Sequence, residues 1–176
     1  NVLQGNGKTT GSLLVEDPKI AVISFTGSTS VGRWIAEVAA KRLTRVSLEL
    51  GGKNPFIVCD DADLDQAVHW AVLSAFSNAG QRCAAGSRIL IFRSVYEVFK
   101  EKFINKANDL KLGVEEGCDL GPVINKRQQM NILDAIQVAK NEGGTILCGG
   151  SLPISNNLSS GYYIQPTVID NLSRTA

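Results

Sequence analysis

Hydrophobic positions along the chain fall into two alternating kinds of run, which predict strands and helices in turn. Short apolar runs predict strands over 20–25, 54–59, 89–92 and 145–148, and alternation predicts another over 46–50. The β-branched run 20–25 is expected to be a buried strand. Apolar residues spaced three and four apart predict helices over 31–39, 64–76, 95–110 and 132–139. A last extended segment is expected over 162–169. Because strands alternate with helices, the pattern predicts an α/β fold with largely parallel pairing.

Capping residues and glycines predict where several of these elements end. One of the hydroxyl residues 28–30 can cap the first amphipathic helix, and Asn125 can cap the last one, which ends before Gly143. A loop and a short helix are both compatible with the glycine-containing segment 1–16. One strand–helix unit ends and another begins at 51–53 (Gly-Gly-Lys), so we expect a domain boundary there.

Composition excludes several classes of protein. The chain has 176 residues, of which 44% are apolar and 20% charged, and its net charge is only +1. This composition is typical of a folded protein rather than a disordered one. The near-neutral charge argues against nucleic acid as a partner, and no apolar run approaches the length of a membrane helix. We therefore expect neither nucleic acid nor a membrane as a partner.

The four cysteines are widely spaced and form no C-x-x-C pair. With a single histidine, His69, this spacing argues against both a zinc site and a disulfide framework. We expect no bound metal, four reduced thiols that are mostly small buried residues, and a cytoplasmic protein. His69 lies within a predicted helix, between Val68 and Trp70, which favours a surface or packing role over catalysis.

The first candidate site is the strand-to-helix turn 25–32, Phe-Thr-Gly-Ser-Thr-Ser-Val-Gly. Free backbone N–H groups and the positive end of the helix favour a phosphate there, which Gly27 would allow to approach closely and Ser28 could hydrogen-bond. The pattern is neither G-x-G-x-x-G nor a P-loop. Taken alone, the pattern favours an ordinary turn with a hydroxyl cap over a phosphate site.

The second candidate is Glu49, which stands between Leu48 and Leu50 in a predicted strand. Strand alternation places it on a solvated face in the simpler interpretation. Burial would instead favour its protonated form and suit it to act as a general base. The adjacent Gly51 and Gly52 allow a ligand or another segment to approach closely.

The third candidate is Cys83, in a loop rich in glycine and alanine between a predicted helix and a strand. Its small neighbours leave room for a substrate, and Arg82 or Arg88 could favour the thiolate. The alternative is a structural cysteine, because a nearby arginine need not reach the sulfur.

Together these motifs resemble the aldehyde dehydrogenase superfamily. The 25–32 turn is similar to that family's nucleotide-binding turn, 48–53 to its general-base signature and 80–83 (Gly-Gln-Arg-Cys) to its nucleophile signature. Their order and separations match, and 161–168 is similar to a later strand region. The resemblance covers essentially the whole chain, and its three ordered motifs outweigh the simpler interpretation of each one.

The resemblance implies mostly parallel sheets flanked by helices. Residues 1–50 would be the C-terminal part of a Rossmann-like NAD(P)-binding domain, and 51–176 the N-terminal part of the catalytic domain. It implies NAD or NADP as cofactor and a set of cofactor-binding residues: Phe25, Thr26, Gly27, Ser28, Gly32, Leu50 and Gly51. Of these, Leu50 and Gly51 would lie near the nicotinamide.

The implied reaction is oxidation of an aldehyde to a carboxylate. Cys83 would attack the carbonyl to give a thiohemiacetal, with the oxyanion held by its own backbone N–H and a side-chain amide. Hydride transfer to the cofactor would leave a thioester, which water activated by Glu49 would hydrolyse. Relatives that pass the acyl group to coenzyme A tend to lack this glutamate, so Glu49 favours the hydrolytic reaction.

Several family segments are not found in this sequence. They are the upstream Pro-Trp-Asn that supplies the oxyanion-hole amide, an upstream lysine on the ribose, a downstream Glu-Ile-Phe-Gly-Pro and the terminal oligomerisation strand. We therefore expect an internal fragment of a longer enzyme, which the resemblance implies to be a dimer or tetramer. A semialdehyde or simple aliphatic aldehyde is the expected substrate. Two alternatives remain: the chain alone is a folded but non-catalytic fragment, or Cys83 serves a hydrolase without a cofactor.

Overall fold

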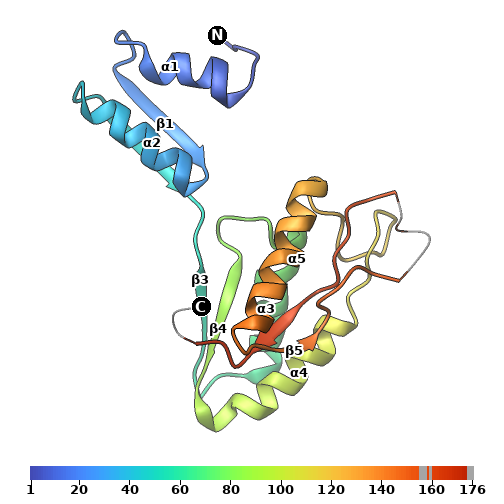
Figure 1. The fold of residues 1–176 in the computed structure, drawn as a ribbon. Coiled ribbons are helices and arrows are strands. Elements are labelled where there is room, and N and C mark those ends of the chain that lie inside the picture. The colour runs from blue at the N-terminus through green and yellow to red at the C-terminus, as the bar shows by residue number, and fades with distance from the viewer. Residues whose placement is uncertain (155–157, 159, 174–176) are drawn as a thin grey trace. The chain divides into compact units, whose positions relative to one another are not determined.

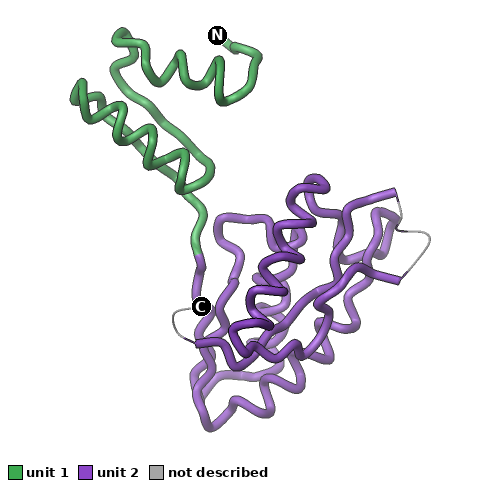
Figure 2. Tube along the Cα trace, in the orientation of Figure 1, with its two compact units in different colours: residues 1–52 green, residues 53–176 purple. Residues whose placement is uncertain are grey.

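The computed structural model describes residues 1–154, 158 and 160–173. The chain divides after Gly52 into two compact units, residues 1–52 and 53–176 (Figure 2). The division falls at the Gly-Gly-Lys segment where we expected a domain boundary.

Unit 1 is built around a pair of parallel strands. Strand β1 (Val22–Gly27) pairs in parallel with β2 (Arg45–Leu50), and helix α2 (Thr29–Ala40) connects them (Figure 1). The N-terminal segment contains a π-helical turn, η1 (Gly7–Gly11), followed by helix α1 (Ser12–Glu16). Of the two alternatives for residues 1–16, the short helix is therefore the one observed.

The Arg42 side chain ties α1 to the end of α2. Its guanidinium donates to the carbonyl oxygens of Val15 (2.9 Å) and Glu16 (3.1 Å), at the C-terminal end of α1. The last carbonyls of a helix have no partner within it, so a cation that donates hydrogen bonds satisfies them and complements the helix dipole.

The strand β1 differs from the prediction in its bounds and its burial. It begins at Val22 rather than residue 20, and pairing with β2 extends it to Gly27. Val22 is 61% exposed. The apolar run was predicted to be a buried strand, but α2 covers only one face of this two-stranded sheet, so alternate residues stay exposed.

Unit 2 contains a second parallel pair, β3 (Asn54–Val58) with β4 (Gly86–Ile91). Between β3 and β4 come α3 (Leu64–Phe76) and η2 (Ser77–Gly80). After β4 come η3 (Arg93–Val95), α4 (Tyr96–Asn108), α5 (Lys126–Asn141), β5 (Thr145–Cys148) and β6 (Val168–Asp170). All four predicted helices of the chain are present, and Ser28 and Asn125 cap α2 and α5 as expected.

The core of unit 2 lies between the β3–β4 pair and helices α3 and α4. Its buried residues are Val58, Val68, Ala71, Val72, Phe99 and Phe103. Phe99 is 0% exposed, and its ring stacks on that of Phe103 with centroids 5.7 Å apart. All of these residues except Val58, which ends β3, come from the apolar spacings that predicted the helices, so the pattern that indicated α3 and α4 also forms the core.

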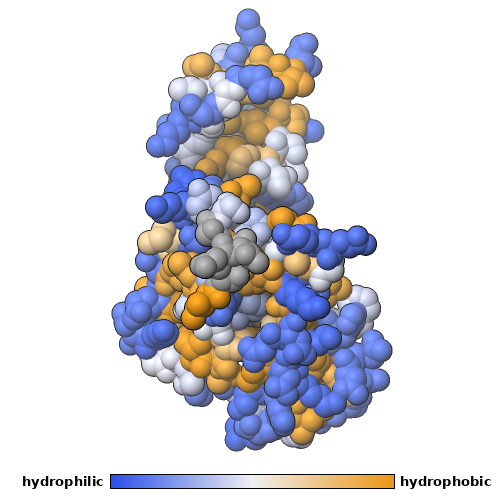
Figure 3. Space-filling view, turned by 90° about the vertical axis from the view of Figure 1, so that its right-hand side faces the viewer, coloured by the Kyte–Doolittle hydropathy of each residue, from blue (hydrophilic) through white to orange (hydrophobic). Residues whose placement is uncertain are grey.

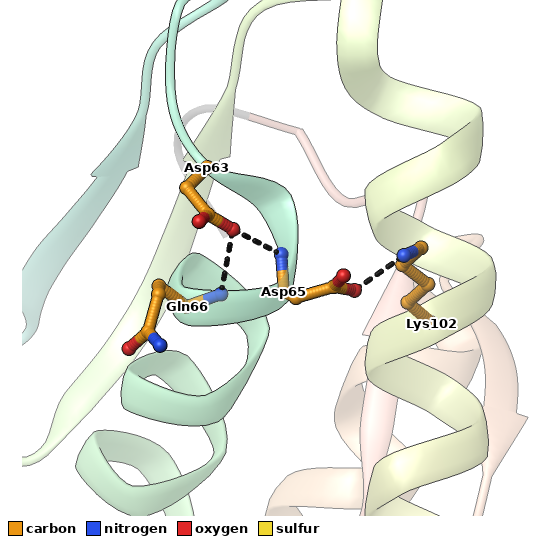
Figure 4. Close-up of polar contacts among 4 residues, drawn as sticks. All are labelled: Asp63, Asp65, Gln66 and Lys102. Carbon is orange, nitrogen blue, oxygen red and sulfur yellow. Dashed lines mark hydrogen bonds and ion pairs between the residues drawn. The ribbon is translucent and has the colours of Figure 1, made fainter.

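Polar contacts position α3 and link it to α4 (Figure 4). The Asp63 carboxylate accepts from the backbone N–H groups of Asp65 (3.0 Å) and Gln66 (3.1 Å), so it caps the helix N-terminus. The Asp65 carboxylate in turn forms an ion pair with Lys102 on α4. Both carboxylates also suit the positive end of the helix dipole.

A second cluster joins β6 to α4. The Tyr96 hydroxyl donates to the Asp170 carboxylate, and the Lys100 ammonium lies over the Tyr96 ring, 4.4 Å from its centroid. Lys100 also pairs with Glu97 at 2.9 Å. Burial, and then the hydrogen bond to Asp170, raise the pKa of the Tyr96 hydroxyl above its ordinary value.

The C-terminal region forms an antiparallel strand pair. Strand β6 (Val168–Asp170), at the end of the predicted extended segment 162–169, pairs with β5 in the antiparallel sense. Two of the three strand pairs are parallel among the residues that the structure describes. The α/β class with mostly parallel sheets is therefore confirmed.

Apolar side chains remain on the surface of both units. In unit 2, Ile57 and Leu90 are register partners on β3 and β4 and are 60% and 53% exposed. The face drawn in Figure 3 carries hydrophobic side chains among hydrophilic ones. None of the described helices is long and apolar enough to cross a membrane.

Candidate active site

Cys83 lies in a tight turn just before β4. The turn is closed by a hydrogen bond from the Ala85 N–H to the Arg82 carbonyl, 3.1 Å long. Because C=O and N–H point in opposite directions in a trans peptide, an Arg82 carbonyl turned inward directs the Cys83 N–H out of the turn. Among the described residues, nothing accepts a hydrogen bond from this N–H. Cys83 is exposed and its thiol is free, so a free thiol and an unpaired donor belong to the same exposed residue.

A strained backbone precedes the turn. Asn78, Ala79 and Gly80 all have positive φ, at 55°, 53° and 70°. Glycine and asparagine tolerate the left-handed region, whereas an alanine there costs about 1 kcal/mol or more. Strain of this kind persists only where surrounding contacts hold it, and it is common near functional sites.

Gln81 supplies one of those contacts. Its side-chain amide donates to the Asn78 carbonyl (3.2 Å), while its amide oxygen accepts from the Ile124 N–H (3.0 Å). The residue two positions before Cys83 therefore fastens the loop to the segment that leads into α5. The sequence indicated Gln81 only as part of a motif, and this anchoring role was missed because Ile124 is 43 residues away.

The two arginines near Cys83 are engaged elsewhere. Arg82 donates to the Ser77 hydroxyl, and Arg88 donates twice to the Lys53 carbonyl. Neither guanidinium pairs with the Cys83 thiol in the described part of the chain, so the idea that one of them stabilises the thiolate is not supported.

Most of the cysteines are not buried, contrary to expectation. Cys59 and Cys83 are exposed, Cys118 is half-buried and Cys148 is buried. All four are free thiols. Burial raises the pKa of the Cys148 thiol, which keeps it protonated and unreactive. Exposure therefore distinguishes Cys83 from Cys148, but Cys59 shares it.

Glu49 lies on the uncovered face of the β1–β2 pair. It is the register partner of Thr26, and both side chains are exposed. The solvated-face interpretation is the one the structure shows, and the buried alternative is wrong for this chain.

The turn between β1 and α2 has open backbone donors. The Ser28 carbonyl and hydroxyl accept from the N–H groups of Gly32 (3.0 Å) and Val31 (3.4 Å), which caps the helix. In the described structure no hydrogen bond uses the N–H groups of Thr29 and Ser30. These donors and the dipole of a twelve-residue helix would favour an anion at this end.

Two glycines allow this turn to pack closely. A Cβ at Gly27 would lie 2.4 Å from the Phe25 ring, and a Cβ at Gly32 would lie 2.7 Å from the Leu50 side chain. Gly32 is buried where α2 meets β2. The absence of a side chain at Gly32 lets α2 lie close to Leu50, the neighbour of Glu49 on β2.

The predicted residues thus gather in two places. Glu49, Leu50, Gly51 and the 25–32 turn belong to unit 1, and Cys83 belongs to unit 2. His69 is exposed on α3 with its ring edge-on to Trp70, which agrees with a surface role. It also lines an open groove of about 420 Å³ between α3 and α4, which Cys83 does not border. The residues described contain no cluster suited to a metal ion.

Comparison with known proteins decides the family. The model of the aldehyde dehydrogenase family matches residues 1–176. The chain belongs to the aldehyde dehydrogenase family. The resemblance carried by the three ordered motifs of the sequence is therefore confirmed.

Among aldehyde dehydrogenases, the chain is similar to plant and bacterial members. It is 41% identical over 175 residues to a chloroplastic betaine aldehyde dehydrogenase of Amaranthus hypochondriacus, covering 98% of this chain and 34% of that protein. A chloroplastic aminoaldehyde dehydrogenase of Arabidopsis thaliana is 44% identical with the same coverage. An alpha-ketoglutaric semialdehyde dehydrogenase of Bacillus subtilis is 38% identical. The chain therefore spans about a third of the length of the curated relatives it matches.

The fold agrees with solved structures of the family. A betaine aldehyde dehydrogenase from Staphylococcus aureus, solved in complex with NAD+, superposes with a TM-score of 0.94 at 38% identity. The match covers 97% of this chain and 34% of that one. The aldehyde dehydrogenase fold predicted from the motifs, incomplete in this chain, is confirmed.

Proposed function

We propose that the protein to which this chain belongs oxidises an aldehyde to a carboxylate with NAD or NADP, using Cys83 as nucleophile. The observation that carries the proposal is the Cys83 turn, where an exposed thiol and a free, outward-directed N–H belong to one residue. Family membership and the NAD+-bound relative add support.

The Cys83 turn can perform the first step. The sulfur attacks the carbonyl carbon, a C–S bond forms, and the carbonyl electrons move to oxygen. The Cys83 N–H then donates to the oxyanion, a stabilisation of the kind usually worth about 2.7–4 kcal/mol per donor. The resemblance assigns a second donor, a side-chain amide, to a segment outside this chain.

The turn between β1 and α2 fits a dinucleotide. The unpaired N–H groups of Thr29 and Ser30 at the start of α2 suit a pyrophosphate, and Gly27 keeps the turn free of a side chain. The proposed cofactor-binding set is completed by Phe25, Thr26, Ser28, Gly32, Leu50 and Gly51. When bound, the nicotinamide supplies the acceptor for the hydride from the substrate carbon, which leaves a thioester on Cys83.

Glu49 is the proposed base for the last step. Its exposed carboxylate takes a proton from a water molecule, whose oxygen attacks the thioester carbon. The C–S bond breaks, the carboxylate product leaves, and the Cys83 thiolate is restored. In balance, aldehyde, NAD+ and water give carboxylate, reduced cofactor and protons.

Two variants of the full-length protein test these roles. Cys83→Ala removes the nucleophile, so formation of reduced cofactor, followed by absorbance, should stop. Glu49→Gln should still give one burst of reduced cofactor per active site but release carboxylate slowly, because acylation does not need the base. Steady-state turnover of Glu49→Gln equal to wild type would mean that Glu49 is not the base.

The isolated chain is a separate case. It spans about a third of its relatives, and the residues proposed for chemistry lie on two units. We expect the 176-residue chain alone to fold without catalysing aldehyde oxidation. Cofactor reduction by the chain alone, abolished by Cys83→Ala, would refute this.

Substrate, assembly and location are proposed only as classes. An aliphatic aldehyde or semialdehyde is the proposed substrate, and betaine aldehyde, an aminoaldehyde and a semialdehyde form the panel to assay. A dimer or tetramer is proposed for the full-length protein, to be measured by sedimentation. A cytoplasmic location stays a prediction, since plant relatives are named chloroplastic or peroxisomal.

A further inference from the structure

The side chain of Asn54, the first residue of β3, reaches the turn that carries Cys83. Its amide nitrogen donates to two carbonyl oxygens, those of Cys83 and Ala85, the second at 3.2 Å. Carbonyl oxygens can only accept, so the nitrogen rather than the oxygen of the amide must face them. Both hydrogens of one amide therefore hold the turn on either side of Ala84.

Two local features prepare Asn54 for this role. Pro55 follows it, and a residue before proline is restricted to extended backbone. The strand register pairs Asn54 with Gly86 and Pro55 with Arg88, so Ser87 forms a bulge in β4. The bulge occurs where the Cys83 loop enters the strand, which places the loop carbonyls opposite the Asn54 side chain.

The hydrogen bond to the Cys83 carbonyl controls one particular motion. The peptide between Cys83 and Ala84 is the central peptide of the turn, and such a peptide can flip between two turn types. A flip changes ψ of Cys83 and requires positive φ at Ala84, which Ala84 does not have. The Asn54 amide opposes the flip directly, because the carbonyl would leave its donor.

We propose that Asn54 is a positioning residue for the nucleophile: its amide holds the Cys83 turn in the form that presents thiol and N–H together. The inference rests on the proposed role of Cys83. It adds a residue that lies 29 positions earlier in the sequence and outside the nucleophile signature. Asn54 itself touches neither substrate nor cofactor in this scheme.

The primary test compares three variants of the full-length protein. Asn54→Asp keeps the shape of the side chain but replaces the donor with an acceptor that faces two carbonyl oxygens. Asn54→Ala removes the group. Asn105→Ala is the matched control, because Asn105 is exposed on α4 and its side chain has no hydrogen bond in the described structure. We expect kcat to fall at least about tenfold in both Asn54 variants, while their KM for NAD stays unchanged. The Asn105→Ala control should keep the wild-type kcat.

A second measurement reports on the turn without relying on catalysis. The Ala85 N–H closes the turn, so its hydrogen exchange, followed by NMR, should be at least about tenfold faster in Asn54→Asp. Alkylation of the buried Cys148 monitors the fold, and it should stay as slow as in wild type. A general loss of structure would expose Cys148 as well.

A double variant tests the flip itself. Glycine at position 84 removes the penalty on positive φ, so Ala84→Gly should lower kcat more in the Asn54→Ala background than alone. A role of Asn54 in stability alone would make the two losses independent.

The outcomes separate the inference from the proposed function. Wild-type kcat and Ala85 exchange in Asn54→Asp would overturn the role of Asn54, whatever Cys83→Ala does. Full turnover in Cys83→Ala would instead overturn the proposed nucleophile. If Cys83→Ala kept full turnover, faster Ala85 exchange in Asn54→Asp would still show that Asn54 holds the turn. Faster Ala85 exchange with wild-type kcat in Asn54→Asp would reject Asn54 as a positioning residue for the reaction.

Discussion

Replacing Gly32 by alanine should press α2 away from β2. The added Cβ would lie 2.7 Å from Leu50 Cδ2 and 3.1 Å from Cδ1. Carbon atoms in contact prefer about 3.5–4.0 Å, so helix and strand must separate by about 1 Å or Leu50 must change rotamer. Overpacking of this kind costs about 1–3 kcal/mol, whereas alanine gains about 0.8–1.0 kcal/mol over glycine in helix propensity. The net expectation is a loss of up to about 2 kcal/mol in the free energy of unfolding.

The same substitution in a Leu50→Ala background provides the control. Truncating Leu50 removes both atoms that the new Cβ would meet, so only the propensity gain remains. Gly32→Ala should then stabilise unit 1 by up to about 1 kcal/mol, which reverses its sign. The coupling between the two sites is expected at about 1–3 kcal/mol.

The assay uses the two tryptophans of the chain, one in each unit. Trp34 lies on α2 and Trp70, which is 54% exposed, lies on α3. With Trp70→Phe as the common background, urea unfolding followed by fluorescence reports on unit 1 alone. An equal effect of Gly32→Ala with and without Leu50 would refute the packing argument.

Three further predictions concern unit 2. Ala79→Gly should raise the free energy of unfolding by about 1 kcal/mol in urea titrations that use Trp70 fluorescence, because glycine relieves the positive φ; a loss would show that Ala79 is not strained. Phe99→Ala should cost about 3–5 kcal/mol in the same assay, since the ring is 0% exposed. The neighbouring Val98 is 49% exposed, so Val98→Ala should cost under about 1 kcal/mol. Similar losses in both variants would contradict the core assignment. Tyr96 has a raised pKa in the folded state, so the stability it contributes is complete below pH ~10 and is lost as pH rises through the folded pKa. Tyr96→Phe should remove that part of the alkaline decline in the free energy of unfolding. An unchanged dependence of stability on pH would contradict this role of Tyr96.

Local patterns predicted the elements well because local physics sets them. The four helices follow from apolar spacing, and the caps Ser28 and Asn125 follow from side chains that bond their own helix starts. The last strand was harder, because the pairing of Val168–Asp170 with a segment about twenty residues earlier depends on register rather than on a local signal.

Burial was predicted less well than element type. The apolar run of β1 was expected inside, yet the described chain covers one face only and leaves Val22 exposed. Most of the four thiols were expected to be buried, yet only Cys148 is. Burial depends on which segments pack over a residue, and periodicity in a single stretch does not specify them.

The sequence by itself determined the α/β class, the family and the candidate residues Cys83 and Glu49, since these depend on residue types at short, ordered spacings. Only the tertiary structure decided how the Cys83 turn is held. Two long-range contacts hold it: Asn54 bonds to Cys83, 29 residues later, and Gln81 bonds to Ile124, 43 residues later. The groups they meet are backbone carbonyls and N–H groups, which are chemically the same at every position. No pattern of side chains reveals which of them a given amide will meet, because chain folding alone brings them within hydrogen-bond distance.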